Sequence, residues 1–102
     1  MKVVFVSGPF RGANAWEIHK NVLRAEAVVP YLLSKGYAPI VPHLITANLQ
    51  GVYPDELYLD MCLELIKRCD TLFMLNGFDK SQGAMEELAL AKELGLEIFY
   101  EE

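Results

Sequence analysis

The sequence predicts an α/β fold in which a mainly parallel sheet of about four strands lies between two layers of helices. Short apolar, β-branched runs alternate with longer segments whose apolar residues recur every three or four positions, which is typical of β-α-β units. Two of the runs, residues 2–7 and 70–75, are mostly apolar, as in strands that helices cover on both faces. The length of 102 residues suits one core, so residues 1–102 are expected to form a single domain.

The first half of the chain is expected to contain two strands and one helix. Residues 2–7 form the first strand, which ends at a Ser-Gly-Pro turn. Apolar side chains at helical spacing predict a helix over residues 18–33, which Pro30 could bend. Residues 37–42 form a short second strand, and its two prolines favour an edge of the sheet. Residues 43–54 are expected to be a loop.

The second half repeats the alternation of helix and strand. The helical period returns over residues 55–69, and residues 70–75 form a third, buried strand. A polar loop follows over residues 76–83, because Asn-Gly opens it and serine and glycine close it. Residues 84–94 predict the last helix and residues 96–100 the last strand.

Charge and composition exclude several classes of function. The net charge of −5 leaves no basic surface for DNA or RNA, so a nucleic-acid polymer is not an expected partner. The apolar N-terminal run is too short for a signal peptide or a membrane span, so the chain is expected to be cytoplasmic and not to bind membranes. Cys62 and Cys69 lie seven residues apart on one predicted helix, about 10 Å, so both are expected to be reduced thiols. No metal-ligand spacing occurs, and no cofactor or metal is expected.

Ligands of open α/β sheets bind outside the carboxyl ends of the strands, which here are residues 7–12, 42–43 and 76–83. In the first of these turns, Gly8 and Gly12 allow backbone N–H groups to approach a ligand closely. The helix that follows presents its positive N-terminal end, so the turn could bind an anion. The segment matches neither a dinucleotide-binding motif nor a P-loop. A tight turn without a ligand remains the alternative.

The last predicted helix carries a candidate catalytic carboxylate. At 100° per residue, three small or apolar side chains share the inward arc: Ala84, Leu88 and Ala91. Glu86 and Glu93 point to the opposite side, whereas Glu87 lies on the flank of the apolar arc. A carboxylate at that place is partly desolvated, as in a nucleophile or a general acid. The alternative is that Glu87 only compensates the helix dipole.

Several segments of the chain, in order, resemble the nucleoside 2-deoxyribosyltransferase-like superfamily, and especially its small branch found in phages and bacteria. The segments are residues 7–12 (SGPFRG), Asn21, Gly36 with Pro39, residues 42–43 (PH), residues 69–70 (CD) and residues 81–87 (SQGAMEE). The resemblance implies a flavodoxin-like, Rossmann-like three-layer sandwich. It also implies cleavage or exchange of the N-glycosidic bond in deoxynucleosides or their monophosphates.

The resemblance further implies roles for individual residues. Glu87, and not Glu86, is the counterpart of the family's nucleophile, which would attack C1′ of the sugar. Ser81 and the backbone near Gly83 would hold a 5′-phosphate or hydroxyl, and Arg11 is a possible phosphate partner. His43 could reach the same mouth or only hydrogen-bond its loop. The candidate substrate-binding residues are Ser7, Gly8, Pro9, Phe10, Arg11, His43, Asp79, Ser81 and Gly83.

Two positions depart from the family's pattern. Phe5 stands where the family commonly has a tyrosine, so a hydroxyl that helps to orient the nucleophile is expected to be missing. Cys62 stands where an aspartate assists at the base or sugar. Asp60 turns to the solvent side of its helix, which leaves Asp79 as the next candidate for that role.

These observations lead to one expected function and two alternatives. The expected function is that of a nucleoside or nucleotide N-glycosidase or 2-deoxyribosyltransferase, with a nucleoside or nucleoside monophosphate as its small-molecule partner. The alternatives are a catalytically impaired nucleotide-binding module and a structural subunit of the same fold. A homodimer or higher homo-oligomer is also expected, because relatives often complete their site with a neighbouring subunit and because apolar aromatic residues lie near element ends. These aromatic residues are Trp16, Tyr53, Phe78 and Tyr100.

Overall fold

A computed structural model describes residues 1–102 and contains one sheet of four parallel strands. In spatial order the strands are β2 (Ala38–Ile40), β1 (Val3–Ser7), β3 (Thr71–Met74) and β4 (Glu97–Tyr100). This order, 2-1-3-4, is that of flavodoxin-like folds, in which strand order reverses between β1 and β3. The expected α/β class, the parallel sheet and the place of the second strand at an edge are therefore confirmed.

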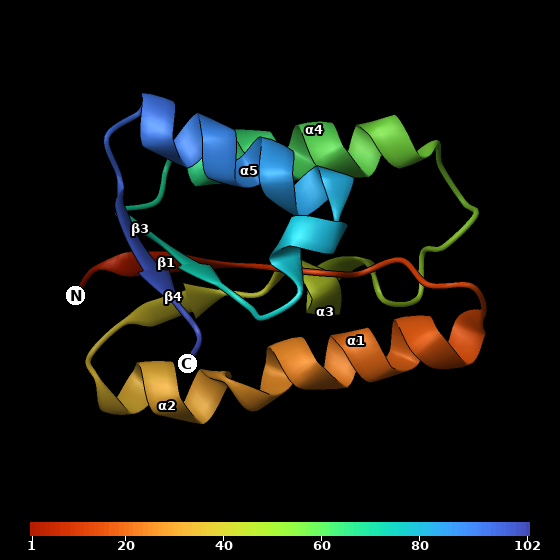
Figure 1. The fold of residues 1–102 in the computed structure, drawn as a ribbon, viewed down its shortest axis with the longest axis horizontal. Helices are drawn as coiled ribbons and strands as arrows, with labels where there is room; N and C mark the ends of the chain where they lie inside the picture. The colour runs from red at the N-terminus through yellow and green to blue at the C-terminus, as the bar shows by residue number, and fades with distance from the viewer.

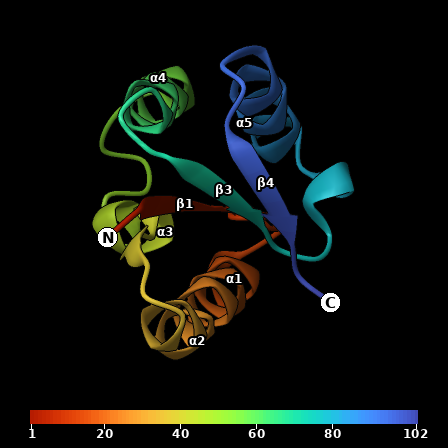
Figure 2. The ribbon, with the colours of Figure 1, turned by 90° about the vertical axis from the view of Figure 1, so that its left-hand side faces the viewer.

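Helices cover both faces of the sheet, which gives three layers (Figure 1). The helices are α1 (Ala15–Ala27), α2 (Val29–Ser34), α3 (Pro42–Thr46), α4 (Asp55–Ile66), α5 (Gln82–Glu93) and the 3₁₀ helix η1 (Phe78–Lys80). Figure 2 shows α4 and α5 together on one face and α1 and α2 on the other. None of the helices combines the length and the apolar character that crossing a membrane requires.

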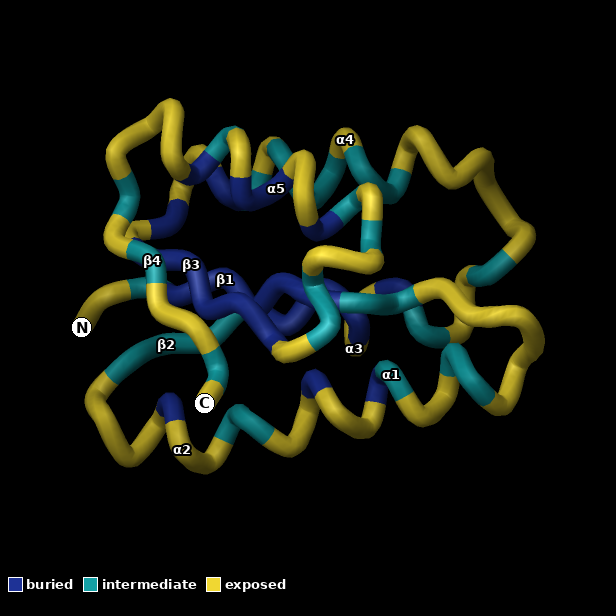
Figure 3. The backbone as a smooth tube through the Cα atoms, in the orientation of Figure 1, coloured by how far each residue is buried: buried dark blue, intermediate teal, exposed yellow.

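The two central strands are buried because apolar side chains leave both of their faces. Side chains alternate along a strand, so Val4 and Val6 pack in the cluster under α1 and α2. Phe5 points the other way, into the cluster under α4 and α5 that includes Leu72 of β3. Ser7 lies two residues beyond Phe5 and therefore faces α5 as well. The central strands are the most continuously buried part of the backbone in Figure 3.

The helix expected over residues 18–33 is two helices that meet at Val28. Pro30 lies in the first turn of α2, where its missing N–H costs nothing. Continued as one helix, the chain would set the proline ring against the Glu26 carbonyl oxygen four residues earlier. The expected bend is therefore present, but it lies ahead of Pro30 and divides the helix.

The segment over residues 37–54 differs from its prediction in one respect. Pro42 does not extend the edge strand but begins α3, inside the segment expected to be a loop. A proline with its fixed φ is suited to the first position of a helix, so Pro42 is compatible both with the end of an edge strand and with the start of a helix. Pro39, in contrast, lies in the edge strand β2 as expected.

The last two helices have different limits from those expected. α4 ends at Ile66, so Cys69 lies beyond the helix that carries Cys62, and both thiols are free. α5 begins at Gln82, two residues earlier than expected. Its N-cap is Ser81, whose hydroxyl oxygen accepts a hydrogen bond from the Ala84 N–H.

Candidate active site

A cavity of about 470 Å³ opens beside the carboxyl ends of β1 and β3, where the strand order reverses. Its walls come from the turn after β1, the start of α3, the first turns of α4 and the first turns of α5. Eight of the residues singled out from the sequence line it: Gly8, Pro9, Phe10, Arg11, His43, Ser81, Gly83 and Glu87. The fold thus brings three segments that are far apart in the sequence to one cavity.

Glu87 lies in the second turn of α5 with only 7% of its surface exposed. Its inward neighbours Ala84, Leu88 and Ala91 are buried, as the helical wheel indicated. The Ser7 hydroxyl donates a 2.6 Å hydrogen bond to Glu87 Oε1 from the end of β1. The carboxyl group is therefore buried at the cavity wall and fixed through one oxygen.

Burial raises the pKa of Glu87 from 4.5 to about 7. Hydrogen bonds from Ser7 and from the Cys62 thiol oppose this rise, because they stabilise the anion, whereas the charge of Glu86 adds to it. No cation contributes to the balance. Protonated and ionised forms of Glu87 therefore coexist near neutral pH.

Cys62 projects from α4 into the same cavity. Burial and the neighbouring Glu87 raise the pKa of its thiol to about 12. The group therefore stays a neutral thiol, which can donate a weak hydrogen bond but cannot act as an anionic base. A carboxylate at this position would instead place a second negative charge next to Glu87.

Ser7 provides a hydroxyl on the face where Phe5 lacks one. Phe5 is fully buried in the core under α4 and α5. Ser7 is also 0% exposed, so it lies behind Glu87 and not on the cavity surface with the substrate-binding candidates. The two-residue period of a strand already predicts that Phe5 and Ser7 share one face.

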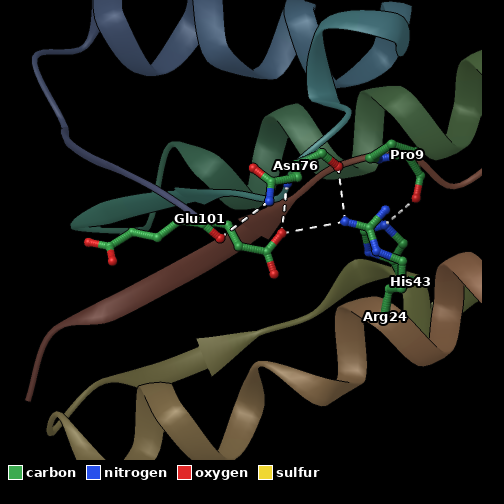
Figure 4. Close-up of polar contacts among 6 residues, drawn as sticks. Pro9, Arg24, His43, Asn76 and Glu101 are labelled. Carbon is green, nitrogen blue, oxygen red and sulfur yellow. Dashed lines mark hydrogen bonds and ion pairs between the residues drawn. The ribbon is translucent and has the colours of Figure 1, made fainter.

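His43 lies at the cavity wall, but only 3% of its surface is exposed. Its Nε2 lies 3.1 Å from the Pro9 carbonyl oxygen, and a carbonyl only accepts, so Nε2 carries the proton (Figure 4). Burial lowers the pKa of His43, with a smaller contribution from the charge of Arg24, so the ring is neutral at pH 7. The sequence left two alternatives for His43, a place at the cavity mouth or a hydrogen bond to a loop. The structure shows features of both, because His43 lines the cavity and also hydrogen-bonds the loop after β1.

A polar network missed by sequence reasoning lies beside His43. Arg24 of α1 donates to the Asn76 carbonyl oxygen at 3.1 Å and approaches the Glu101 carboxylate at 3.4 Å (Figure 4). Glu101 in turn accepts a 2.8 Å hydrogen bond from the Asn76 backbone N–H. The network joins α1 to the segments that follow β3 and β4, so it holds the carboxyl ends of these two strands together.

Arg11 bridges the mouth of the cavity to α4. Its Nη1 lies 3.2 Å from Asp55 Oδ2, and both side chains are more than half exposed. An exposed pair of this kind is weak, so Arg11 can exchange Asp55 for an anionic group of a ligand. Asp55 gave no signal in the sequence beyond its place at the start of a helix, because the contact depends on tertiary structure.

The N-terminus of α5 presents hydrogen-bond donors to the cavity. The N–H groups of Gln82 and Gly83 have no partner within the helix, as at every helix start. Ser81 uses its hydroxyl oxygen as an acceptor and keeps its proton free to donate. With Lys80 on the same wall, these groups suit an anion or a hydroxyl.

Two acidic residues behave differently from their sequence-based expectation. Asp79 is exposed on η1 and does not line the cavity, because the 3₁₀ turn carries it away from the wall. Glu86 is exposed as expected, and it also borders the cavity. Asp60 is exposed on α4, in agreement with the helical wheel.

Comparisons with known proteins agree with this architecture. A family model described as domain of unknown function DUF4406 matches residues 2–100. A solved structure described as a 2-desoxiribosyltransferase from Leishmania mexicana is similar, with a TM-score of 0.61 at 22% identity. The match covers 98% of this chain and 63% of that one, so the chain spans under two thirds of that protein's length. At this identity the likeness shows the fold, and a search of curated proteins found no match.

Proposed function

The chain belongs to the DUF4406 family, and from its deoxyribosyltransferase-like fold and its cavity we propose that it cleaves or transfers the N-glycosidic bond of deoxynucleosides or their monophosphates. One observation carries the proposal. Glu87 is a buried carboxyl group at the cavity wall, with a hydroxyl donor fixed on one of its oxygens.

Glu87 is proposed to act as the nucleophile. Its ionised oxygen bonds to C1′ of the sugar while the C1′–N bond breaks, and that electron pair leaves with the base, which takes up a proton. Water, or the nitrogen of a second base, then attacks C1′ and displaces the Glu87 oxygen as a carboxylate, and the attacking group gives up a proton that balances the one taken up by the leaving base. The first route is hydrolysis and the second is transfer.

The cavity walls next to Glu87 support binding of a nucleotide. Ser81 and the free N–H of Gly83 offer donors for a 5′-phosphate or 5′-hydroxyl. Arg11 offers a cation that only an exposed carboxylate now engages. Gly8, Pro9 and Arg11 form the proposed sugar and base side, and Phe10 lines the cavity next to them.

Incubation with deoxynucleosides and deoxynucleoside monophosphates tests the proposal, with base release followed by chromatography. Glu87→Ala is expected to reduce base release by at least about a hundredfold, because no other carboxylate is held at the same point. Glu93→Ala is the matched control, since it removes an exposed carboxylate from the far end of the same helix. Equal base release by Glu87→Ala and the wild type would refute the nucleophile assignment.

A catalytically impaired nucleotide-binding module is the second candidate. Two observations favour it: Phe5 brings no hydroxyl to the site, and Cys62 brings a neutral thiol with a pKa of about 12. Such a module would be stabilised against heat by deoxynucleoside monophosphates while no base is released. Stabilisation together with base release would instead favour the enzyme.

A homodimer or higher homo-oligomer is also proposed. Trp16, Tyr53 and Tyr100 are 62%, 54% and 50% exposed, so they offer apolar surface to a second copy. Phe78 is half-buried and packs near the Tyr100 ring, with 5.6 Å between centroids. The nucleoside or nucleotide remains the proposed small-molecule partner.

A further inference from the structure

The Ser7 hydroxyl has Glu87 as its only hydrogen-bond partner. Ser7 is 0% exposed, so water does not compete for its proton. Its Oγ lies 2.6 Å from Glu87 Oε1, which is the short distance of a hydrogen bond between a hydroxyl and a carboxylate. A buried serine far from any reacting group usually bonds a nearby backbone carbonyl, whereas this one bonds a carboxyl group eighty positions away.

We propose that Ser7 is a positioning residue for Glu87, whose hydroxyl holds one carboxylate oxygen so that the other faces C1′ of a bound sugar. The proposal rests on the nucleophilic role proposed above for Glu87. It assigns Ser7 to the chemistry through Glu87 and not to direct contact with the substrate.

The backbone around Ser7 is well suited to this role because it is rigid. β3 pairs with β1 as far as Ser7, which is in register with Met74, whereas β2 pairs with residues 3–5 of β1. The Leu75 N–H donates a 2.8 Å hydrogen bond to the Ser7 carbonyl oxygen. A serine side chain has one rotatable carbon–carbon bond, so a strand this firmly held fixes its Oγ closely. Glu87 has three such bonds, and the hydroxyl restricts them from the opposite layer of the fold.

The charge balance around Glu87 gives the hydroxyl a measurable effect. The groups that face the carboxyl are Ser7 from β1, Cys62 from α4 and Glu86 from α5 itself. Ser7 and Cys62 are neutral donors and Glu86 is an anion, so hydrogen bonds are the stabilisation that the Glu87 anion receives there. Phe5, on the same face of β1, has no polar atom with which to contribute. Loss of the Ser7 hydroxyl is therefore expected to raise the pKa of Glu87 further.

The decisive experiment is an NMR titration of the Glu87 carboxyl carbon in the full chain without ligand. Ser7→Ala is expected to raise the Glu87 pKa by about one to two pH units, which corresponds to the loss of one hydrogen bond to a charged group. Thr71→Val is the matched control. It also removes a fully buried strand hydroxyl, but that hydroxyl bonds the Val3 carbonyl oxygen at the other end of the sheet. The control is expected to leave the Glu87 titration unchanged.

A second variant, Ser7→Cys, tests the proposal if Ser7→Ala folds poorly. Ser7→Cys has nearly the same size and a weaker donor, so its Glu87 pKa is expected between those of the wild type and Ser7→Ala. A Glu87 titration that is unchanged in either variant would overturn the proposal. An equal shift in Thr71→Val would also overturn it, because the effect would then be structural.

Kinetics separate a positioning role from a binding role. With a deoxynucleoside that the wild type cleaves, Ser7→Ala is expected to lower kcat by about 10- to 100-fold while KM changes little. The acidic limb of the rate profile is expected to move to higher pH together with the Glu87 pKa. A raised KM with unchanged kcat would contradict positioning. Absence of base release from the wild type would refute the proposed function, and the NMR titration would still decide whether Ser7 holds Glu87.

Discussion

The ionisation of Glu87 is set by burial without a cation. A carboxylate in the interior is usually paired with Arg or Lys, which lowers its pKa. Glu87 has only Ser7 and Cys62 as donors, so its pKa lies at about 7. An enzyme that uses the carboxylate as a nucleophile would then gain activity as the pH rises through that value.

The same group should make the stability of the protein depend on pH. Because the pKa of Glu87 is raised from 4.5 to about 7 by folding, protonated Glu87 favours the native state. This stabilisation is complete below pH 4.5 and is lost as the pH rises through about 7, for a total of ~3 kcal/mol. Glu87→Gln is expected to lack this loss. In urea unfolding, the free energy of unfolding of the variant relative to the wild type is therefore expected to be higher at pH 8 than at pH 5. The exposed Glu93→Gln serves as the control, and a pH dependence equal in wild type and Glu87→Gln would contradict the burial argument.

Single residues differ in how far the sequence predicts them. The flank position of Glu87 on α5 follows from the helical wheel, because helical periodicity is local. The strand period predicts which way Ser7 points and the helix period predicts which way Glu87 points. Their contact also depends on how α5 packs on β1, which no local pattern specifies. The pairs Arg11–Asp55 and His43–Pro9 join loops to helices, and no local pattern specifies where loops lie.

At the scale of the elements, the turn after β1 is tightly constrained by packing. A Cβ on Gly8 would lie 2.6 Å from the Cβ of Leu75, which is closer than two carbon atoms approach without a shift. The turn can thus pass against the end of β3 only with glycine at this position. The sequence indicated a turn there, but it could not show which neighbour requires the glycine.

Gly8→Ala is therefore expected to lower the free energy of unfolding by about 1 to 3 kcal/mol, because backbone or core side chains must move. Gly83→Ala is the matched comparison, since the nearest atom to its added Cβ, from Leu59, is 4.0 Å away and alanine suits a helix. Denaturant unfolding of both variants measures the contrast. Equal stability of the two variants would show that the chain relaxes around Gly8 without cost.

Element limits were predicted less well than element types, for reasons that can be named. Proline both ends strands and begins helices, so the sequence favours Pro42 as the end of the edge strand, whereas the structure has it at the start of α3. Pro30 marked a bend, but the steric conflict acts on the preceding turn and the break falls at Val28. Ser81 caps α5 through its side chain, a signal that the Ser-Gln-Gly sequence already contained.

At the scale of the whole molecule, two separate clusters of buried apolar side chains stabilise the fold. One lies between the sheet and α4 with α5, and the other lies between the sheet and α1 with α2. The parallel sheet was predictable because helices alternate with strands along the chain, and strands with apolar residues on both faces need two helical layers. The position of the cavity, at the carboxyl ends of the strands, was predictable. The contribution of α4 to its lining was not.

Self-association is the prediction that belongs to this scale. Light scattering at tens of micromolar protein is expected to give at least twice the 11.5 kDa mass of the chain. The apolar surface at Trp16, Tyr53 and Tyr100 provides the physical reason, so the mass should persist in high salt, which weakens charge pairs but not apolar contacts. A mass of 11.5 kDa at every concentration would contradict the proposal.

Pro39 in the edge strand β2 has a further consequence for how copies of the chain can meet. The Ala38 N–H donates inward to the Lys2 carbonyl oxygen, so by alternation the backbone of Pro39 faces the open edge. An incoming strand would find no donor there, which blocks continuous sheet extension and hence fibril growth from that side. On the opposite edge, the charge of Glu97 in β4 discourages the same pairing. The proposed association of copies would therefore use closed contacts between side-chain surfaces and not open-ended stacking of strands.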